Sequence, residues 1–202
     1  MRLAMILLCL FMGVKVFAAS PDTLALMRLA EQNLSKSPLL EAKFQQKTTM
    51  PFIDVALESD GKFCFDIRNR EKPLIFWEYQ TPDVSGFFLK DGKASFWTAK
   101  EGKELSESEM KSLKGMTDQI FQWISFDPQK LLKIYNASKT GPRTLRFEPL
   151  GKSRLFSAIE FTLTEDFQKL ESLAFHGQNG EITNLLFNVE TLNQPLSDAC
   201  RK

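Results

Sequence analysis

The sequence predicts an α+β protein that is mainly β, built on one antiparallel sheet of about ten strands. Apolar and polar residues alternate with a period of two over much of the chain, in segments bounded by turn residues. Hairpin signals recur at Asp60-Gly61, at Asp91-Gly92 and in "GQNG" at 177–180, so neighbouring strands should be antiparallel. Apolar residues at helical spacing occur in three places only.

The first eighteen residues are predicted to be a secretory signal peptide. Arg2 is followed by the apolar run "LAMILLCLFMGV" and by "KVFAAS", which fits cleavage after Ala18 with Val16 as the other small residue. The apolar run is well under the roughly 20 residues that a membrane-spanning helix requires. We therefore divide the chain into a signal peptide, 1–18, and one exported domain, 19–202, that is free in solution.

The domain should begin with an amphipathic helix over residues 21–37. Ser20 can serve as its N-cap, and Pro21 stands at the first helical position. The apolar stripe of this helix consists of Leu24, Met27, Ala30 and Leu34.

Two further helices are predicted in the middle of the chain. Residues 115–125 have a helical stripe formed by Met116, Ile120, Phe121 and Ile124. Residues 126–136 follow directly, with Asp127 as N-cap and Pro128 at the first helical position.

The strands are predicted from alternation, which also predicts which way their side chains face. In "KFCFDI", 62–67, Phe63 and Phe65 share one face and Cys64 lies on the other. Later strands are predicted within 155–164, 167–177 and 181–191.

Charge and length indicate one nearly neutral domain. The chain has 26 basic and 25 acidic residues, and removal of 1–18 leaves 24 and 25. Binding to nucleic acid depends on clustered Lys and Arg against phosphate, so we expect no nucleic-acid partner. The remaining length suffices for one domain with its own core.

Catalytic motifs are lacking in the sequence. His176 is the single histidine, and it stands at a strand end beside a turn, without a nucleophile-elbow pattern elsewhere. Glu104, Glu107 and Glu109 lie in a charged segment typical of solvated surface. There is no phosphate-binding loop and no closely spaced Cys or His pair for zinc. We expect a protein that is not an enzyme and has no metal or cofactor.

Two cysteines remain in the exported domain, Cys64 and Cys200. In an oxidising compartment such a pair is usually bridged, and two free thiols are the alternative. Cys64 points away from the face of Phe63 and Phe65. The segment that leads to Cys200 follows the last strand and can cross that same outer surface, so we predict a Cys64–Cys200 disulfide.

Phenylalanine is abundant, with 18 in the chain and 16 after removal of the signal peptide. So much aromatic surface suits either an ordinary packed core or a site that holds an apolar ligand.

The order of several short motifs resembles that of the LolA-like periplasmic carriers of outer-membrane lipoproteins. These motifs are "KFQQK" at 43–47, Gly61, "KPLIFWEYQTPD" at 72–83, "LKDGKASFW" at 89–97 and "ITNLLFNVETLNQPLSD" at 182–198. Each is degenerate by itself, but their order and spacing extend over nearly the whole exported domain.

This resemblance implies a strongly curved antiparallel sheet of about ten or eleven strands, a half-open and incomplete β-barrel whose concave face is covered by a helical lid. It also implies a soluble periplasmic monomer. Its partners would be an acylated lipoprotein cargo, an inner-membrane complex that releases the cargo and an outer-membrane acceptor.

One position departs from the family pattern. Carriers of general lipoproteins commonly have Arg directly before the proline that corresponds to Pro73, whereas this chain has Lys72. Lys keeps the charge but lacks the planar fork of donors. The preceding turn is also longer, so Arg68 or Arg70 could supply the guanidinium. The cargo is therefore either a lipoprotein or a different lipidated or glycolipid molecule, with Lys72 acting in its transfer.

The match at Trp77 places Ile75, Trp77 and Tyr79 on one inward face, and a carrier of this family would hold acyl chains between that face, the apolar face of the neighbouring strands and the lid. The side chains expected to contact acyl chains are Phe44, Phe63, Phe65, Ile75, Trp77 and Tyr79 on the sheet, with Met116, Ile120, Phe121 and Ile124 on the lid. Two other functions are open: a lipid-binding sensor or envelope-stress regulator on the same half-barrel, and a periplasmic lipid enzyme, which the missing nucleophile and base disfavour.

Overall fold

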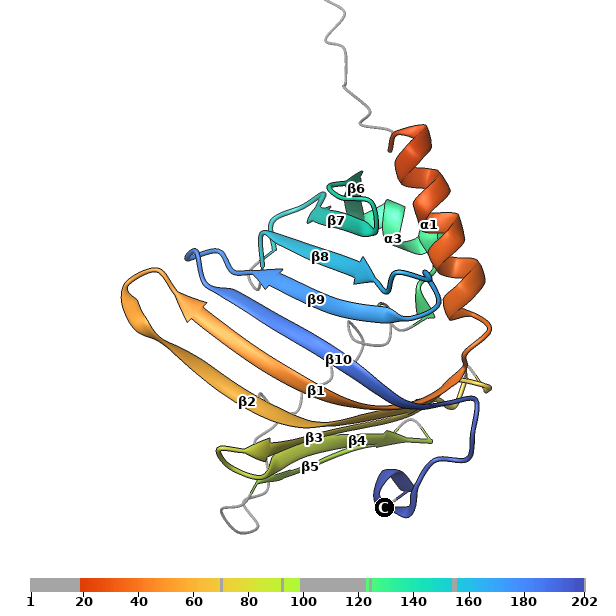
Figure 1. The fold of residues 1–202 in the computed structure, drawn as a ribbon, viewed down its shortest axis with the longest axis vertical. Helices are drawn as coiled ribbons and strands as arrows, with labels where there is room; N and C mark the ends of the chain where they lie inside the picture. Colours follow the sequence, from red (N-terminus) through yellow and green to blue (C-terminus); the bar gives the residue numbers. More distant parts are fainter. Residues whose placement is uncertain are drawn as a thin grey trace, which may run out of the picture.

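A single curved sheet of ten antiparallel strands forms most of the molecule (Figure 1). The computed structural model describes residues 19–69, 71–91, 93–98, 123, 125–153 and 156–201. The strands are β1 Leu39–Met50, β2 Ile53–Asp66, β3 Leu74–Thr81, β4 Ser85–Lys90, β5 Lys93–Thr98, β6 Tyr135–Lys139, β7 Thr144–Pro149, β8 Ala158–Leu163, β9 Leu170–His176 and β10 Ile182–Leu192.

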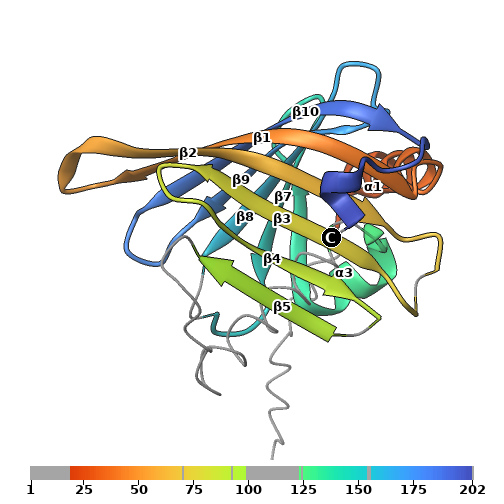
Figure 2. The ribbon, with the colours of Figure 1, turned by 90° about the horizontal axis from the view of Figure 1, so that it is seen from below.

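The sheet consists of two meanders that meet at β1 and β10. Its order is β5-β4-β3-β2-β1-β10-β9-β8-β7-β6, so every neighbour is also a neighbour in the chain except the central pair. Among the described residues no pairing joins β5 to β6, and the curved sheet stays open (Figure 2). This confirms the predicted mainly β fold with an incomplete barrel.

Two α-helices are described, α1 over Pro21–Leu34 and α3 over Pro128–Ile134. Ser20 Oγ accepts a hydrogen bond from the Thr23 backbone N–H at 3.2 Å, and Asp127 Oδ1 accepts one from the Lys130 N–H at 3.1 Å. Both N-caps are the predicted ones. The predicted helix at 115–125 lies outside the described residues except for Trp123 and Ser125.

Helix α1 crosses one end of the β6–β9 meander. Its first turn is tied to the edge strand β6, since Thr23 Oγ1 accepts the Lys139 N–H at 3.0 Å. Its last turn is tied to the loop between β8 and β9, where Asn33 Nδ2 donates to the Phe167 carbonyl oxygen at 3.0 Å. Leu26, Met27 and Ala30 thereby join the core of the concave face, so the helix covers part of that face.

The predicted turn at Asp60-Gly61 is wrong, because β2 continues through it and the turn lies at Pro51-Phe52. Gly61 serves packing: a Cβ there would lie 1.9 Å from the Glu78 carbonyl oxygen of β3. The absence of a side chain lets the two strands approach.

The other two predicted turns are at their expected places. Asp91, with φ of 51°, connects β4 to β5. Gly180, with φ of 83°, closes the turn between β9 and β10 in a conformation that favours glycine.

Candidate functional site

Five aromatic side chains from four neighbouring strands line the concave face, and we call this group the aromatic wall. They are Phe44 of β1, Phe63 of β2, Trp77 and Tyr79 of β3, and Phe187 of β10. Trp77 is at the centre, with its ring centroid 4.4 Å from that of Phe44 and 5.1 Å from that of Phe63. Such ring pairs contribute about 0.5–1.5 kcal/mol each beyond the burial of their area.

Strand register explains why these rings meet. Phe63 is directly opposite Trp77, and Phe44 is opposite both Phe187 and Gly61. A Cβ at Gly61 would lie 2.7 Å from Phe44 Cζ, so glycine also makes room for the phenyl ring. The same glycine thus sets the approach of β3 and the position of the Phe44 ring.

Tyr79 adds a polar group at the end of the wall. Its hydroxyl donates to Gln46 Oε1 at 2.9 Å, and burial raises the pKa of the phenol. The hydroxyl therefore stays neutral and does not bring charge to the apolar face.

A cavity of about 50 Å³ lies beside the aromatic wall, near the C-terminal end of α1. Its apolar lining includes Phe63 and Phe65 of β2, Phe187 of β10, Phe161 of β8, Leu170 of β9, and Trp123. Ser37, Gln168 and Lys169 are its polar lining residues. Pockets for small molecules usually measure roughly 300–1,000 Å³, so this cavity must enlarge before it admits a long chain.

The structure brings together the six predicted ligand residues that it describes. Phe44, Phe63, Phe65, Ile75 and Trp77 are buried and Tyr79 is half-buried, all in or against the core of the concave face. Of the six, Phe63 and Phe65 line the cavity near α1, and the other four do not. The four predicted lid residues, Met116, Ile120, Phe121 and Ile124, lie outside the described residues.

Several lining residues were not predicted, namely Trp123, Phe161, Leu170 and Phe187. Phe161 and Phe187 belong to predicted strands, so alternation could have placed them on one face. Which strands lie near one another across the concave face depends on the β1–β10 pairing, and no local sequence pattern shows it.

Lys72 is exposed in the turn between β2 and β3, where its backbone N–H donates to the Asn69 carbonyl oxygen at 3.1 Å. Of the two arginines that could replace it, Arg70 lies outside the described residues. Arg68 is paired with Asp66, its Nη2 lying 2.6 Å from Asp66 Oδ2, and this hydrogen-bonded pair lowers the pKa of Asp66. A cargo would have to compete with Asp66 for that guanidinium.

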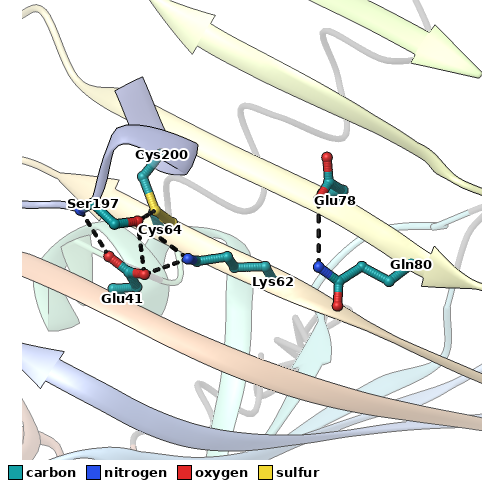
Figure 3. The surroundings of a disulfide bond; sticks show 7 residues. All are labelled: Glu41, Lys62, Cys64, Glu78, Gln80, Ser197 and Cys200. Atoms are coloured by element: carbon teal, nitrogen blue, oxygen red, sulfur yellow. Dashed lines mark hydrogen bonds and ion pairs between the residues drawn. A yellow bond between two sulfur atoms is a disulfide. The ribbon is translucent and has the colours of Figure 1, made fainter. Parts of the chain in front are cut away.

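A second buried cluster lies on the outer face of the sheet, under the C-terminal segment (Figure 3). Cys64 of β2 and Cys200 of the 3₁₀ helix η1, Asp198–Arg201, form a disulfide. Phe76 and Leu196 pack in the same cluster. Cys64 thus points away from the aromatic wall, to the side that alternation indicated.

Glu41 ties the same C-terminal segment to the sheet. Its carboxylate accepts hydrogen bonds from the Ser197 N–H at 3.0 Å and from Ser197 Oγ at 2.9 Å, and it pairs with Lys62 (Figure 3). Burial alone would raise its pKa, but the donors of Lys62 and Ser197 hold the pKa below the ordinary value. No local motif indicates this contact, because Glu41 and Ser197 are 156 residues apart.

The β1–β2 hairpin projects beyond its neighbouring strands (Figure 2). Its tip exposes apolar side chains. Phe52 at the turn is 94% exposed, and Ile53, Val55 and Leu57 follow it on β2. By alternation these last three are on the face of β2 that carries Phe63 and Phe65. The hairpin tip therefore carries apolar side chains on the same face as the aromatic wall, with Ser59 and Gly61 between them on β2.

None of the helices in the described ranges is long and apolar enough to cross a membrane.

Known structures with a similar fold include the crystal structure of MucB, with 13% identity, a TM-score of 0.57, and coverage of 91% of this chain and 64% of that chain. The Pseudomonas aeruginosa MucA/MucB complex matches with 12% identity and a TM-score of 0.52, covering 89% of this chain and 60% of that one. A LolA superfamily protein from Nitrosomonas europaea matches with 9% identity and a TM-score of 0.40, covering 88% and 96%.

The chain thus spans less than two thirds of the MucB chains that it matches, and at such identities the likeness shows the fold. No curated protein sequence matches it significantly. Residues 35–200 match the family described as outer membrane lipoprotein carrier protein LolA. That match extends from the end of α1 to the disulfide and covers most of the chain. The chain therefore belongs to the LolA family.

Proposed function

We propose that this protein is a periplasmic carrier that binds the acyl chains of a lipoprotein, or of a related lipidated or glycolipid cargo, and delivers them from the inner to the outer membrane. The observation that carries the proposal is the aromatic wall, which continues into an apolar cavity with polar groups among its lining residues. Membership of the LolA family supports the same function.

The energetics of transfer require a surface of this kind. A buried methylene contributes roughly 0.8 kcal/mol, so an acyl chain of about 15 methylenes loses on the order of 12 kcal/mol on leaving a membrane for water. A carrier must recover most of this free energy and still release the cargo. Rings and aliphatic side chains with few polar atoms recover it without fixing one chain geometry.

The hairpin tip is the described surface best suited to contact a membrane or the partners that release and accept cargo. Exposed apolar patches mark such contacts. Here the patch consists of Phe52 at the turn and of Ile53, Val55 and Leu57, which lie on the same face of β2 as Phe63, so cargo that contacts the tip would need to cross only Ser59 and Gly61 of that strand to reach the wall.

Binding is tested with a fluorescent fatty-acyl probe and two matched variants. Leu170→Asn introduces an amide into the cavity lining, whereas Leu150→Asn makes the same change where the side chain is 62% exposed. We expect Leu170→Asn to weaken probe binding about tenfold or more, because an unpaired amide in an apolar site is costly, and Leu150→Asn to leave it unchanged. Failure of the parent protein to bind the probe would contradict the carrier function.

A second function, a lipid-binding sensor or envelope-stress regulator, is favoured by the likeness to MucB. The TM-score of 0.57 is the highest of the three comparisons above, and MucB is known in complex with MucA. A sensor would bind the probe but would not pass it to acceptor vesicles. Measuring transfer between donor and acceptor vesicles therefore separates the two functions. We propose no catalytic role, so bound lipid should be recovered chemically intact by mass spectrometry.

A further inference from the structure

Trp123 has a buried hydrogen-bond donor without a partner among the described residues. Its side chain is only 4% exposed, and its indole N–H is buried with no acceptor among the described residues. The ring packs against Tyr135 at 5.2 Å between centroids, Phe147 at 4.9 Å and Phe161 at 6.5 Å. In the described part of the chain, the indole ring therefore packs against other aromatic rings.

A buried, unpaired donor of this kind is stabilised when it gains a hydrogen-bond acceptor. The indole N–H can only donate, and nearly all buried polar groups in proteins have a partner. Leaving this group unpaired costs free energy in the unliganded protein, and that cost is recovered when an acceptor arrives.

Trp123 also lines the cavity beside the aromatic wall, together with Phe63, Phe65 and Leu170. An apolar chain in an enlarged cavity would therefore lie against the indole. An acyl chain differs from a plain hydrocarbon chain in one respect that matters here: the ester or amide carbonyl that joins it to the rest of the molecule is a strong acceptor.

We propose that the Trp123 Nε1–H donates a hydrogen bond to the carbonyl oxygen of an acyl ester or amide bound in this cavity. The inference rests on the proposed binding of acyl chains and specifies the functional group that is recognised. The aromatic wall holds the chain by burial, and Trp123 distinguishes an acyl chain from an alkyl chain and fixes the depth at which its carbonyl lies.

The test uses two lipids that differ at one group, a lysophosphatidylcholine with an ester-linked hexadecanoyl chain and its ether-linked hexadecyl analogue. The parent protein should bind the ester roughly two- to tenfold more tightly than the ether, the range expected for one net hydrogen bond. Trp123→Phe keeps an aromatic ring but removes the donor, so it should bind both lipids with the affinity that the parent has for the ether.

Trp97→Phe is the matched control, because Trp97 stacks on Phe76 against the outer cluster, away from the cavity. It should keep the preference for the ester. The proposal fails if the parent does not distinguish the two lipids, as expected if water satisfies the indole, or if Trp123→Phe keeps the preference. If the parent binds neither lipid, the proposed function fails and this inference with it.

A second measurement does not depend on the folding of the variant. In the parent protein labelled with ¹⁵N-tryptophan, the Trp123 indole proton should shift downfield when the ester lipid binds and shift much less with the ether lipid. Equal shifts with the two lipids would refute the hydrogen bond.

Discussion

Gly61 is the residue on which the aromatic wall most directly depends. A side chain there would collide with the backbone of β3 and with the Phe44 ring, at 1.9 Å and 2.7 Å from Glu78 O and Phe44 Cζ. The backbone atom cannot move aside as a flexible side chain would, so the two strands must separate.

We predict that Gly61→Ala lowers the free energy of unfolding by about 1–3 kcal/mol or more, as overpacking of a core does. Gly151→Ala is the control, since a Cβ at Gly151 has nothing within 4 Å, and it should change the free energy by less than about 0.5 kcal/mol. Urea denaturation of the two variants measures the difference. Equal stabilities would show that β3 can shift freely.

Glu41 should make stability depend on pH at the acid end. Its pKa is lower in the folded protein than the ordinary 4.5, so the folded state favours the carboxylate. This contribution is complete above pH 4.5 and is lost as the pH falls through the folded pKa. We expect Glu41→Gln to be less stable than the parent by about 2 kcal/mol at pH 7, with the difference shrinking below pH 4.5.

Chemical denaturation of the parent and of Glu41→Gln over a pH series measures this difference. Glu165→Gln, on an exposed loop, is the control and should follow the parent throughout. A difference between parent and Glu41→Gln that stays constant down to the acid limit would mean that the charge of Glu41 is not what stabilises the contact.

At the scale of elements, the C-terminal segment is held to the outer face of the sheet, by the disulfide on β2 and by the Glu41 contacts on β1. The disulfide joins residues 136 apart. Chain entropy alone allows up to about 4–5 kcal/mol of stabilisation for so long a loop.

We predict that Cys64→Ala/Cys200→Ala folds but unfolds at lower denaturant concentration, and that its C-terminal segment is cut more rapidly by protease. Thiol labelling of the denatured, unreduced parent should detect no free cysteine in residues 19–202. Two labelled thiols would show that the bridge does not form.

The β1–β2 hairpin can be tested separately from the core. Because Phe52 is almost fully exposed, Phe52→Ser should change the free energy of unfolding by no more than about 0.5 kcal/mol. If the tip contacts membranes or partners, the same variant should slow the uptake of an acyl probe from vesicles several-fold. Leu150→Ser is the control, and a Phe52→Ser rate equal to that of the parent would exclude the tip from transfer.

Helix starts and turns show what the sequence could and could not predict. The start of α3 at Asp127-Pro128 and the turn at Gly180 depend on local backbone chemistry, and the structure has both where the sequence predicts them. Asp60-Gly61 has the same local signal but lies within a long strand, because close contact with Phe44 and β3 decides the role of that glycine. Alternation predicted which side chains share a face of a strand. The Glu41–Ser197 contact and the surroundings of Trp123 could not be predicted in this way, because they bring together segments that are distant in the sequence.

For the whole molecule, the small cavity has a kinetic consequence. A cavity of about 50 Å³ cannot hold a long acyl chain, so binding in this cavity must follow or accompany its enlargement. We predict that the observed rate of probe binding in stopped flow rises with probe concentration and then reaches a plateau set by opening. A rate that stays linear at high concentration would contradict this.

The central position of β1 and β10 governs how the chain reaches its fold. Phe44 of β1 and Phe187 of β10 are direct neighbours in the sheet although they belong to the first and the last of the described strands in the chain. Each meander can form from local hairpins, but until the last strand pairs, each has an edge that can add a strand from another molecule. Joining them closes a very long loop, and such contacts slow folding. We therefore expect the pairing of β1 with β10, which completes the apolar face, to be the slow step of folding and the chain to be most exposed to aggregation before it.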